Sequence, residues 1–161
     1  MRIQVIIPVV VFSGAACGAA ATRPQDPAVD DFLYAIRQVE SGDRYDGPAG
    51  RCGELGAYQF RRQVWCHYTG EPFEEARTPY ADDVALRHYE WIARSLKAAG
   101  MPATPWNIAA AWNCGLAAVR SGRLSRATRD YATRVENLVA SHAEARLALE
   151  AHSARAVPSR N

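Results

Sequence analysis

The sequence of 161 residues has almost no excess of either charge, because 19 Lys and Arg residues stand against 17 Asp and Glu. This balance provides no strong field toward nucleic acid or an anionic membrane, so neither is expected as a partner. Its four histidines and four cysteines form no HExxH or paired CxxC pattern, so no metal and no cofactor are expected. There is no clear alternating strand pattern and no repeat of fixed period, which predicts a mainly α-helical fold.

The first residues are too few and too interrupted for a membrane span, but they have the layout of a secretory signal. Arg2 precedes an apolar run, and small residues follow up to Ala21. We therefore expect residues 1–21 to be a signal peptide, residues 22–29 to be a polar linker, and the mature protein to be exported to the periplasm or the medium. The residues before Cys17 also resemble a lipoprotein box, so the alternative is a signal that ends before Cys17 and a lipid anchor on that cysteine.

The remaining chain has the size of one domain with one hydrophobic core, so a single, monomeric domain is predicted over residues 30–145. The first helix should begin at the acidic pair Asp30-Asp31 and end at Gly42, and Thr128 should cap the last helix. Residues 146–161 should be a helical end that frays beyond Glu150, with a flexible tail. Apolar side chains recur at helical spacing in four stretches: Phe32, Leu33, Ile36 and Val39; Phe60, Val64 and Tyr68; Ala85, Tyr89, Ile92, Ala93 and Leu96; and Tyr131, Val135, Leu138, Val139 and His142.

The stretch from Asp43 to Gly56 is rich in Gly, Asp and Arg and has no periodicity. It is therefore predicted to be an irregular loop in which a very small β-hairpin could be hidden. In an oxidising compartment Cys52, Cys66 and Cys114 would supply one disulfide and leave one thiol, and the sequence does not choose the pair.

Glu40 is the candidate catalytic acid. It lies one helical turn after Ile36 and two turns after Leu33, along the edge of the apolar face. A carboxyl group there is partly desolvated, which raises its pKa as a general acid requires. The alternative is an ordinary charge at a helix end, but a carboxylate in the last turn opposes the helix dipole, so helix stability alone would favour Lys or Arg.

Three short patterns follow one another: Glu40-Ser41, then GAYQ over residues 56–59, then AWNCG over residues 111–115, with Tyr131 later. Together they resemble the soluble lytic transglycosylase branch of the lysozyme-like superfamily, whose motifs are a Glu-Ser pair, GLMQ, AYNAG and a late tyrosine. The resemblance spans about residues 30 to 140. It implies a lysozyme-like fold, with the active site near the irregular loop, and bacterial peptidoglycan strands as substrate.

The resemblance also implies roles for individual residues. Glu40 would be the catalytic acid and base, with Ser41 supporting the site, and Tyr131 would help to place Glu40 and the substrate. Gln59 and Asn113 would lie in the glycan groove, where an amide can donate and accept hydrogen bonds to sugar groups; either could instead be a satisfied loop or cap amide. The expected substrate-binding residues are Ser41, Tyr58, Gln59, Trp112, Asn113 and Tyr131.

The sequence departs from the family pattern at four of these motif positions. Ala57 and Tyr58 stand in place of Leu and Met, Trp112 stands in place of Tyr, and Cys114 stands in place of Ala. Trp112 keeps an aromatic surface but lacks the phenol, and Cys114 could belong to the disulfide. These departures concern the sugar subsites more than the glutamate.

The four tryptophans offer flat faces on which sugars can stack. Trp65 and Trp91 lie within predicted helices and are expected to belong to the core. Trp106 and Trp112 are the better candidates for contact with a ligand.

The number of carboxylates bears on the reaction, because ordinary glycosidases use two. Asp43, Asp46 and Glu54 are the acids near Glu40 in sequence, all in the loop, and each is expected to be a solvated charge. A single glutamate fits lytic transglycosylation as known in the family, which leaves a 1,6-anhydromuramoyl end. The alternatives are a lysozyme-type hydrolase, in which one loop acid activates water, and a non-catalytic peptidoglycan-binding or assembly protein. A partner in a secretion apparatus is a further option.

Overall fold

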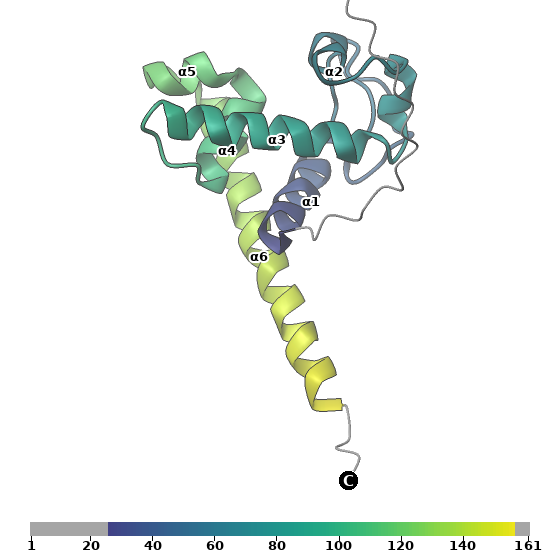
Figure 1. Ribbon diagram of the computed structural model, residues 1–161, viewed down its shortest axis with the longest axis vertical. Helices are drawn as coiled ribbons and strands as arrows, with labels where there is room; N and C mark the ends of the chain where they lie inside the picture. The colour runs from purple at the N-terminus through teal and green to yellow at the C-terminus, as the bar shows by residue number, and fades with distance from the viewer. Residues whose placement is uncertain (1–25, 157–161) are drawn as a thin grey trace, which may run out of the picture.

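The computed structural model describes residues 26–156, and the secondary structure of this part of the chain is almost entirely helical. The mainly α-helical prediction is confirmed. No helix among these residues is both long enough and apolar enough to cross a membrane. The predicted signal peptide, Cys17 and the last five residues lie outside the described residues. The helices are α1 (Pro27–Ser41), α2 (Arg62–Tyr68), the 3₁₀-helix η1 (Phe73–Arg77), α3 (Ala81–Ala98), α4 (Pro105–Cys114), α5 (Leu116–Ser121) and α6 (Arg126–Ala156) (Figure 1).

Helix α1 begins three residues before the predicted start. The Asp26 side chain accepts a hydrogen bond from the backbone N–H of Ala28, and Pro27 occupies the first turn, where its missing N–H costs nothing. The end of the predicted linker, residues 27–29, is therefore helical. The predicted stop is confirmed, because Gly42 caps the helix directly after Ser41.

Helices α3, α4 and α5 follow the apolar pattern of the sequence. The predicted stripe of α3 faces the core, with Ala85, Ile92 and Leu96 fully buried. Gly115 separates α4 from α5.

Helix α6 differs from the prediction at both ends. It begins at Arg126, and the hydroxyl of Ser125 accepts a hydrogen bond from the N–H of Thr128. The predicted Thr128 cap is therefore wrong: Ser125 caps the helix, and Thr128 belongs to its first turn. The helix also continues past Glu150 to Ala156, and Arg146 pairs with Glu150 one turn later along the exposed surface.

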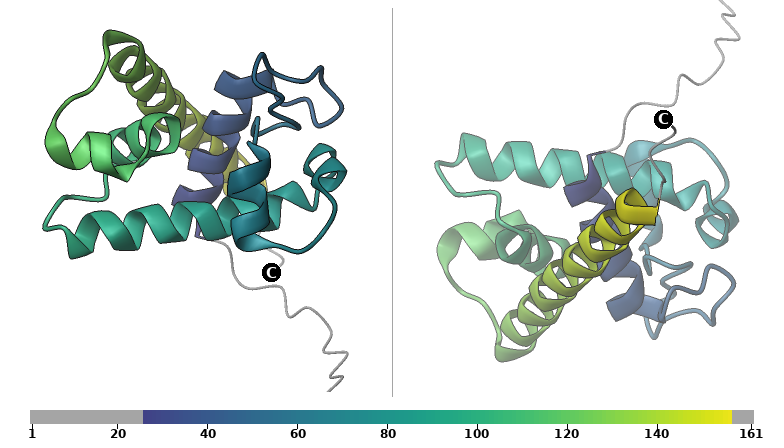
Figure 2. Two further views of the ribbon diagram at one scale, coloured as in Figure 1. Left: turned by 90° about the horizontal axis from the view of Figure 1, so that it is seen from above. Right: turned by 90° about the horizontal axis from the view of Figure 1, so that it is seen from below.

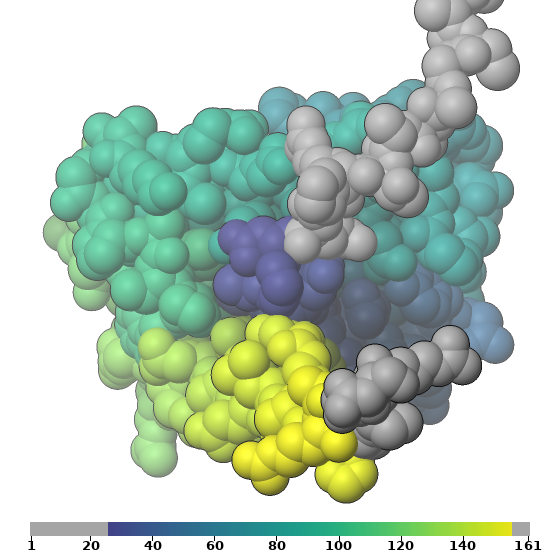
Figure 3. Space-filling model, turned by 60° about the horizontal axis from the view of Figure 1, so that its bottom comes forward, coloured from purple at the N-terminus to yellow at the C-terminus, as the bar shows by residue number. Residues whose placement is uncertain are grey.

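Helix α6 is the longest element, and it packs against both α1 and α4. Its second half projects away from the other helices (Figure 1), and Figure 2 shows the helix from above and from below. On the face shown in Figure 3, the start of α1 is enclosed between α3 and the second half of α6. Glu40 lies at the opposite end of α1.

A buried ion pair joins α1 to α6. Asp31 is 1% exposed, and its carboxylate accepts hydrogen bonds from Arg146, with Nη2 to Oδ2 at 3.0 Å. Nδ1 of His142 lies 2.7 Å from the other carboxylate oxygen, and the His142 ring stacks on Tyr34. A buried carboxylate needs such partners, so this group fixes how α1 lies against α6.

The loop before α2 contains the only β contact of the described residues, an isolated bridge between Leu55 and Phe60. Phe60 was predicted to begin the second helix, but its backbone instead exchanges two hydrogen bonds with Leu55, and α2 starts two residues later. The turn over residues 56–59 is pressed against η1, because a Cβ on Gly56 would lie 1.7 Å from the carbonyl oxygen of Ala76.

Candidate functional site

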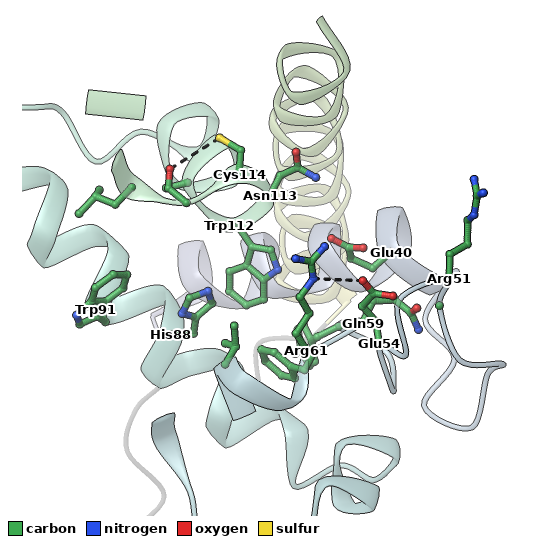
Figure 4. Close-up of a pocket in the computed structure, with 17 residues that line it drawn as sticks. Glu40, Arg51, Glu54, Gln59, Arg61, His88, Trp91, Trp112, Asn113 and Cys114 are labelled. Carbon is green, nitrogen blue, oxygen red and sulfur yellow. Dashed lines mark hydrogen bonds and ion pairs between the residues drawn. The ribbon is translucent and has the colours of Figure 1, made fainter. Parts of the chain in front are cut away.

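A cleft of about 750 Å³ lies between the end of α1, the loop over residues 50–61 and the junction of α4 with α5 (Figure 4). Its size is that of a typical ligand site. The side chains that line it include Glu40, Glu54, Gln59, Trp91, Trp112 and Asn113.

Glu40 ends the buried face of α1 and reaches into this cleft. The phenol O–H of Tyr131, on α6, donates a 2.6 Å hydrogen bond to Glu40 Oε1. Tyr131 is 5% exposed, so the bond is made in a largely dry environment. The structure thus brings together two of the predicted site residues, which are 91 positions apart in the sequence.

Burial raises the pKa of Glu40, and this effect outweighs the hydrogen bond from Tyr131, which lowers it. The nearby charge of Glu54 raises the pKa further, while Arg134 lowers it. A carboxyl group with a raised pKa can keep its proton closer to neutral pH and can donate it to a leaving oxygen.

Ser41 does not line the cleft. Its hydroxyl donates to the carbonyl oxygen of Ala57 at 2.9 Å and accepts from the N–H of Arg44 at 3.1 Å. It therefore ties the end of α1 to the turn over residues 56–59. The Ser41 hydroxyl, which was expected to support the site and to bind the substrate, is thus engaged with the backbone of the loop.

Tyr58 is 1% exposed, and its hydroxyl donates to Asp82 on α3 at 2.6 Å. It also accepts from Arg37 of α1 at 2.9 Å. Burial and the neighbouring Asp82 raise the pKa of Tyr58, so the phenol stays protonated. Tyr58, an expected substrate-binding residue, lines the cleft, but its hydroxyl links Arg37 of α1 to Asp82 of α3.

Gln59 lines the cleft in an unusual backbone conformation, with a φ of 47°. Its Nε2 donates to the carbonyl oxygen of Gly56 at 2.9 Å, which leaves Oε1 directed toward Gly50. A Cβ on Gly50 would lie 2.7 Å from Gln59 Oε1 and 2.4 Å from Glu54 Oε2. The lack of a side chain at Gly50 therefore lets an amide and a carboxylate converge on one side of the cleft.

Asn113 and Trp112 come from the last turn of α4. Asn113 is exposed, and its Oδ1 accepts a hydrogen bond from the Thr128 hydroxyl at 3.0 Å. Within residues 26–156 the amide nitrogen of Asn113 has no hydrogen-bond partner, so it can donate to a ligand. Trp112 is half-buried, and its ring lies edge-on to His88, with 4.6 Å between ring centroids.

Glu54 is the site residue that the sequence did not single out. Its carboxylate accepts a hydrogen bond from the N–H of Cys52 at 2.9 Å and one from Arg61 at 3.2 Å. The backbone bond from Cys52 is the main cause that lowers the pKa of Glu54, so this group stays ionised. One carboxyl with a raised pKa and one with a lowered pKa thus share the cleft, which is how paired acids divide their roles.

The other two loop acids are exposed, but Asp43 is paired and so is not the solvated charge that was expected. Asp43 forms an ion pair with Arg37 at 2.6 Å, directly after the end of α1, and Asp46 is exposed. Neither lines the cleft.

Two further predictions are wrong. Cys52, Cys66 and Cys114 are free and exposed, and no disulfide joins any two of them; the Sγ of Cys114 instead lies 3.1 Å from the carbonyl oxygen of Ala110. Trp65 belongs to the core as predicted, but Trp91 is 40% exposed and lines the cleft. A signal for this was present, since Trp91 is not a member of the apolar stripe of α3.

Comparisons of the chain with family models, with curated proteins and with solved structures find no match. The chemical interpretation of the cleft therefore depends on its own residues. Within residues 26–156, no three His, Cys, Asp or Glu side chains are grouped so that they could hold a metal ion. The polar groups that line the cleft are two carboxyls, two amides, two guanidinium groups, an imidazole and a thiol, and aromatic rings lie beside them.

Proposed function

We propose that this protein is a peptidoglycan lytic transglycosylase that uses Glu40 as its general acid and base. The observation that carries the proposal is the half-buried Glu40 carboxyl, which is raised in pKa and held by Tyr131 on the wall of a sugar-sized cleft. The resemblance of its Glu-Ser, GAYQ and AWNCG segments to lytic transglycosylase motifs supports the same interpretation.

In the proposed reaction, Glu40 donates its proton to the oxygen of the β-1,4 bond between MurNAc and GlcNAc, and the bond from the muramoyl C1 to that oxygen breaks. The Glu40 carboxylate then accepts the proton of the muramoyl 6-hydroxyl, and the oxygen of that hydroxyl bonds to C1. This closes a 1,6-anhydro ring, so no water is consumed. Tyr131 stabilises the carboxylate between the two steps, because its O–H donates to Glu40.

The cleft offers suitable partners for the substrate. The free amide nitrogen of Asn113 can donate to a carbonyl or hydroxyl oxygen of the sugar, and Oε1 of Gln59 can accept from an amide or hydroxyl group. Trp112 provides an aromatic edge beside them. Action on peptidoglycan also fits the proposed export of the chain by residues 1–21 to the periplasm or the medium, free or lipid-anchored at Cys17. Local opening of the wall for a secretion apparatus would be one use of it.

A lysozyme-type hydrolase is the second candidate, and Glu54 is the observation that favours it. A carboxyl group with a lowered pKa in the same cleft as one with a raised pKa fits the arrangement of two-carboxylate glycosidases. In that reaction Glu54 would assist a water molecule in attacking C1, and the product would carry a reducing end.

The test is mass spectrometry of the soluble products that the purified protein releases from bacterial peptidoglycan. Anhydromuropeptides that disappear with Glu40→Gln are the expected result. Glu136→Gln, at an exposed glutamate of α6, is the matched control and should release the same products as the unchanged protein. Reducing-end muropeptides that are lost with Glu54→Gln would show that the reaction is hydrolysis and not transglycosylation. Binding to peptidoglycan by folded protein without any released product would indicate a non-catalytic role.

A further inference from the structure

The floor of the cleft continues away from Glu40 as a row of three aromatic rings. Trp112, His88 and Trp91 follow one another in Figure 4, with Trp91 farthest from Glu40. The rings of His88 and Trp91 are nearly parallel, with an interplanar angle of 8° and centroids 6.1 Å apart. The Tyr68 hydroxyl lies 2.9 Å from Nδ1 of His88, so a hydrogen bond orients the middle ring of the row.

Trp91 is the most accessible ring of this row. It is 40% exposed, although it lies in the middle of the 18-residue helix α3 and its neighbour Ile92 is fully buried. Its indole N–H has no hydrogen-bond partner among residues 26–156, so it is available to donate to a ligand. Burial lowers the pKa of His88 to about 4, so the ring beneath Trp91 is uncharged at neutral pH.

A second cavity of about 300 Å³ opens beside Trp91. It shares Val64, His88 and Trp91 with the cleft of Glu40, so the two cavities adjoin at these side chains and together make up one groove. Gln63 and His67 line its other side. They are one turn apart on α2 and therefore project from the same face of that helix.

We propose that Trp91 is a sugar-stacking platform at the far end of this groove, so that the protein binds a glycan segment extending several sugars from the bond at Glu40. The inference rests on the proposed action on peptidoglycan glycan. A sugar ring has an apolar face for stacking on an indole and hydroxyl or N-acetyl groups at its edge. Gln63 and His67 supply the polar partners for that edge, and Trp91 supplies the flat face. Continuity with the Glu40 cleft favours the substrate strand over a protein partner as the occupant.

The test measures how binding depends on the length of the glycan. The probes are GlcNAc–MurNAc oligomers of two, four and six sugars without peptide stems, titrated by calorimetry into the Glu40→Gln protein so that none is cleaved. Affinity should rise with length. Adding Trp91→Ala should weaken binding of the six-sugar oligomer by about tenfold, and should change binding of the two-sugar oligomer by less than about twofold.

Two variants separate stacking from a general effect on the fold. Trp91→Phe keeps an aromatic face and should recover most of the affinity for the longest oligomer. Leu147→Ala removes another exposed apolar side chain, on the projecting half of α6, and should leave every affinity unchanged. If Trp91→Ala binds all lengths as tightly as its parent, the platform is refuted while the Glu40 site stands. If the parent itself binds no oligomer, the glycan assignment of the whole groove is refuted.

Discussion

The turn over residues 56–59 carries Gln59 and is held against η1 by a close approach of two backbones. Gly56 has a φ of +77°, and its Cα faces the carbonyl group of Ala76. Gly53 is three residues earlier and has a similar φ of +80°, but a Cβ there would meet nothing within 4 Å. Alanine substitutions at these two glycines therefore share the free-energy cost of a left-handed conformation. They differ in that only the Cβ of Gly56→Ala would collide with the carbonyl oxygen of Ala76.

The magnitude follows from these contacts. A left-handed conformation costs a non-glycine residue about 1–2 kcal/mol, which is the whole effect expected for Gly53→Ala. The Cβ of Gly56→Ala would lie 1.7 Å from Ala76 O, so the backbones would have to part by about 1.3 Å to reach even 3.0 Å. Overpacking of this kind adds about 1–3 kcal/mol, giving a total of about 2–5 kcal/mol for Gly56→Ala.

Urea unfolding followed by circular dichroism measures both variants against the unchanged protein. Gly56→Ala should be less stable than Gly53→Ala by about 1–3 kcal/mol, which corresponds to a further fall in Tm of about 4 °C or more for a domain of this size. Equal free energies of unfolding, within about 0.5 kcal/mol, would mean that the turn is not pressed against η1. The position of Gln59 in the cleft would then need another explanation.

Two predictions concern titratable groups. The O–H of Tyr131 donates to Glu40 and thereby lowers the Glu40 pKa. Tyr131→Phe removes this O–H, so the Glu40 pKa should rise, and activity that needs the protonated acid should persist to higher pH. The alkaline limb of kcat/KM should move up by about one pH unit, and an unmoved limb would contradict the role of Tyr131. Arg146 holds the pKa of Asp31 below its ordinary 3.8, so this ion pair stabilises the fold above about pH 4 and loses its effect as the pH falls through the native pKa. Asp31→Asn should therefore lower the free energy of unfolding at pH 7, and the difference from the unchanged protein should shrink below pH 4 in urea titrations. A difference that is independent of pH would show that the charge of Asp31 does not contribute.

The helices could be predicted because apolar spacing alone determines which face is buried. The α3 stripe and the breaks at Gly42 and Gly115 are visible in the sequence, and the position of Glu40 at the edge of an apolar face indicated its burial. The start of α6 was misplaced because Ser125 and Thr128 are equally good caps locally. Only the contact with Asn113 on α4 explains why the Thr128 hydroxyl turns inward.

The composition of the site was harder to predict, because it depends on contacts between distant segments. Nothing in the loop distinguishes Glu54 from Asp46, since the loop has no periodicity. The Glu54 side chain is directed into the cleft by two hydrogen bonds. The N–H of Gly50 donates to the carbonyl oxygen of Glu54, and the N–H of Cys52 donates to its carboxylate. Similarly, the Tyr58 hydroxyl finds Asp82 only when α1 and α3 are packed together.

The bond between Tyr131 and Glu40 also has a consequence for the order in which the protein becomes competent. Glu40 lies near the start of the described chain, whereas its tyrosine belongs to the final helix, as do both partners of Asp31. A ribosome must therefore release the residues of α6 that follow Arg126 before this helix can dock beside α1 and place a phenol against the carboxyl group. During synthesis Glu40 therefore exists without Tyr131, and the site is completed only after α6 has been made.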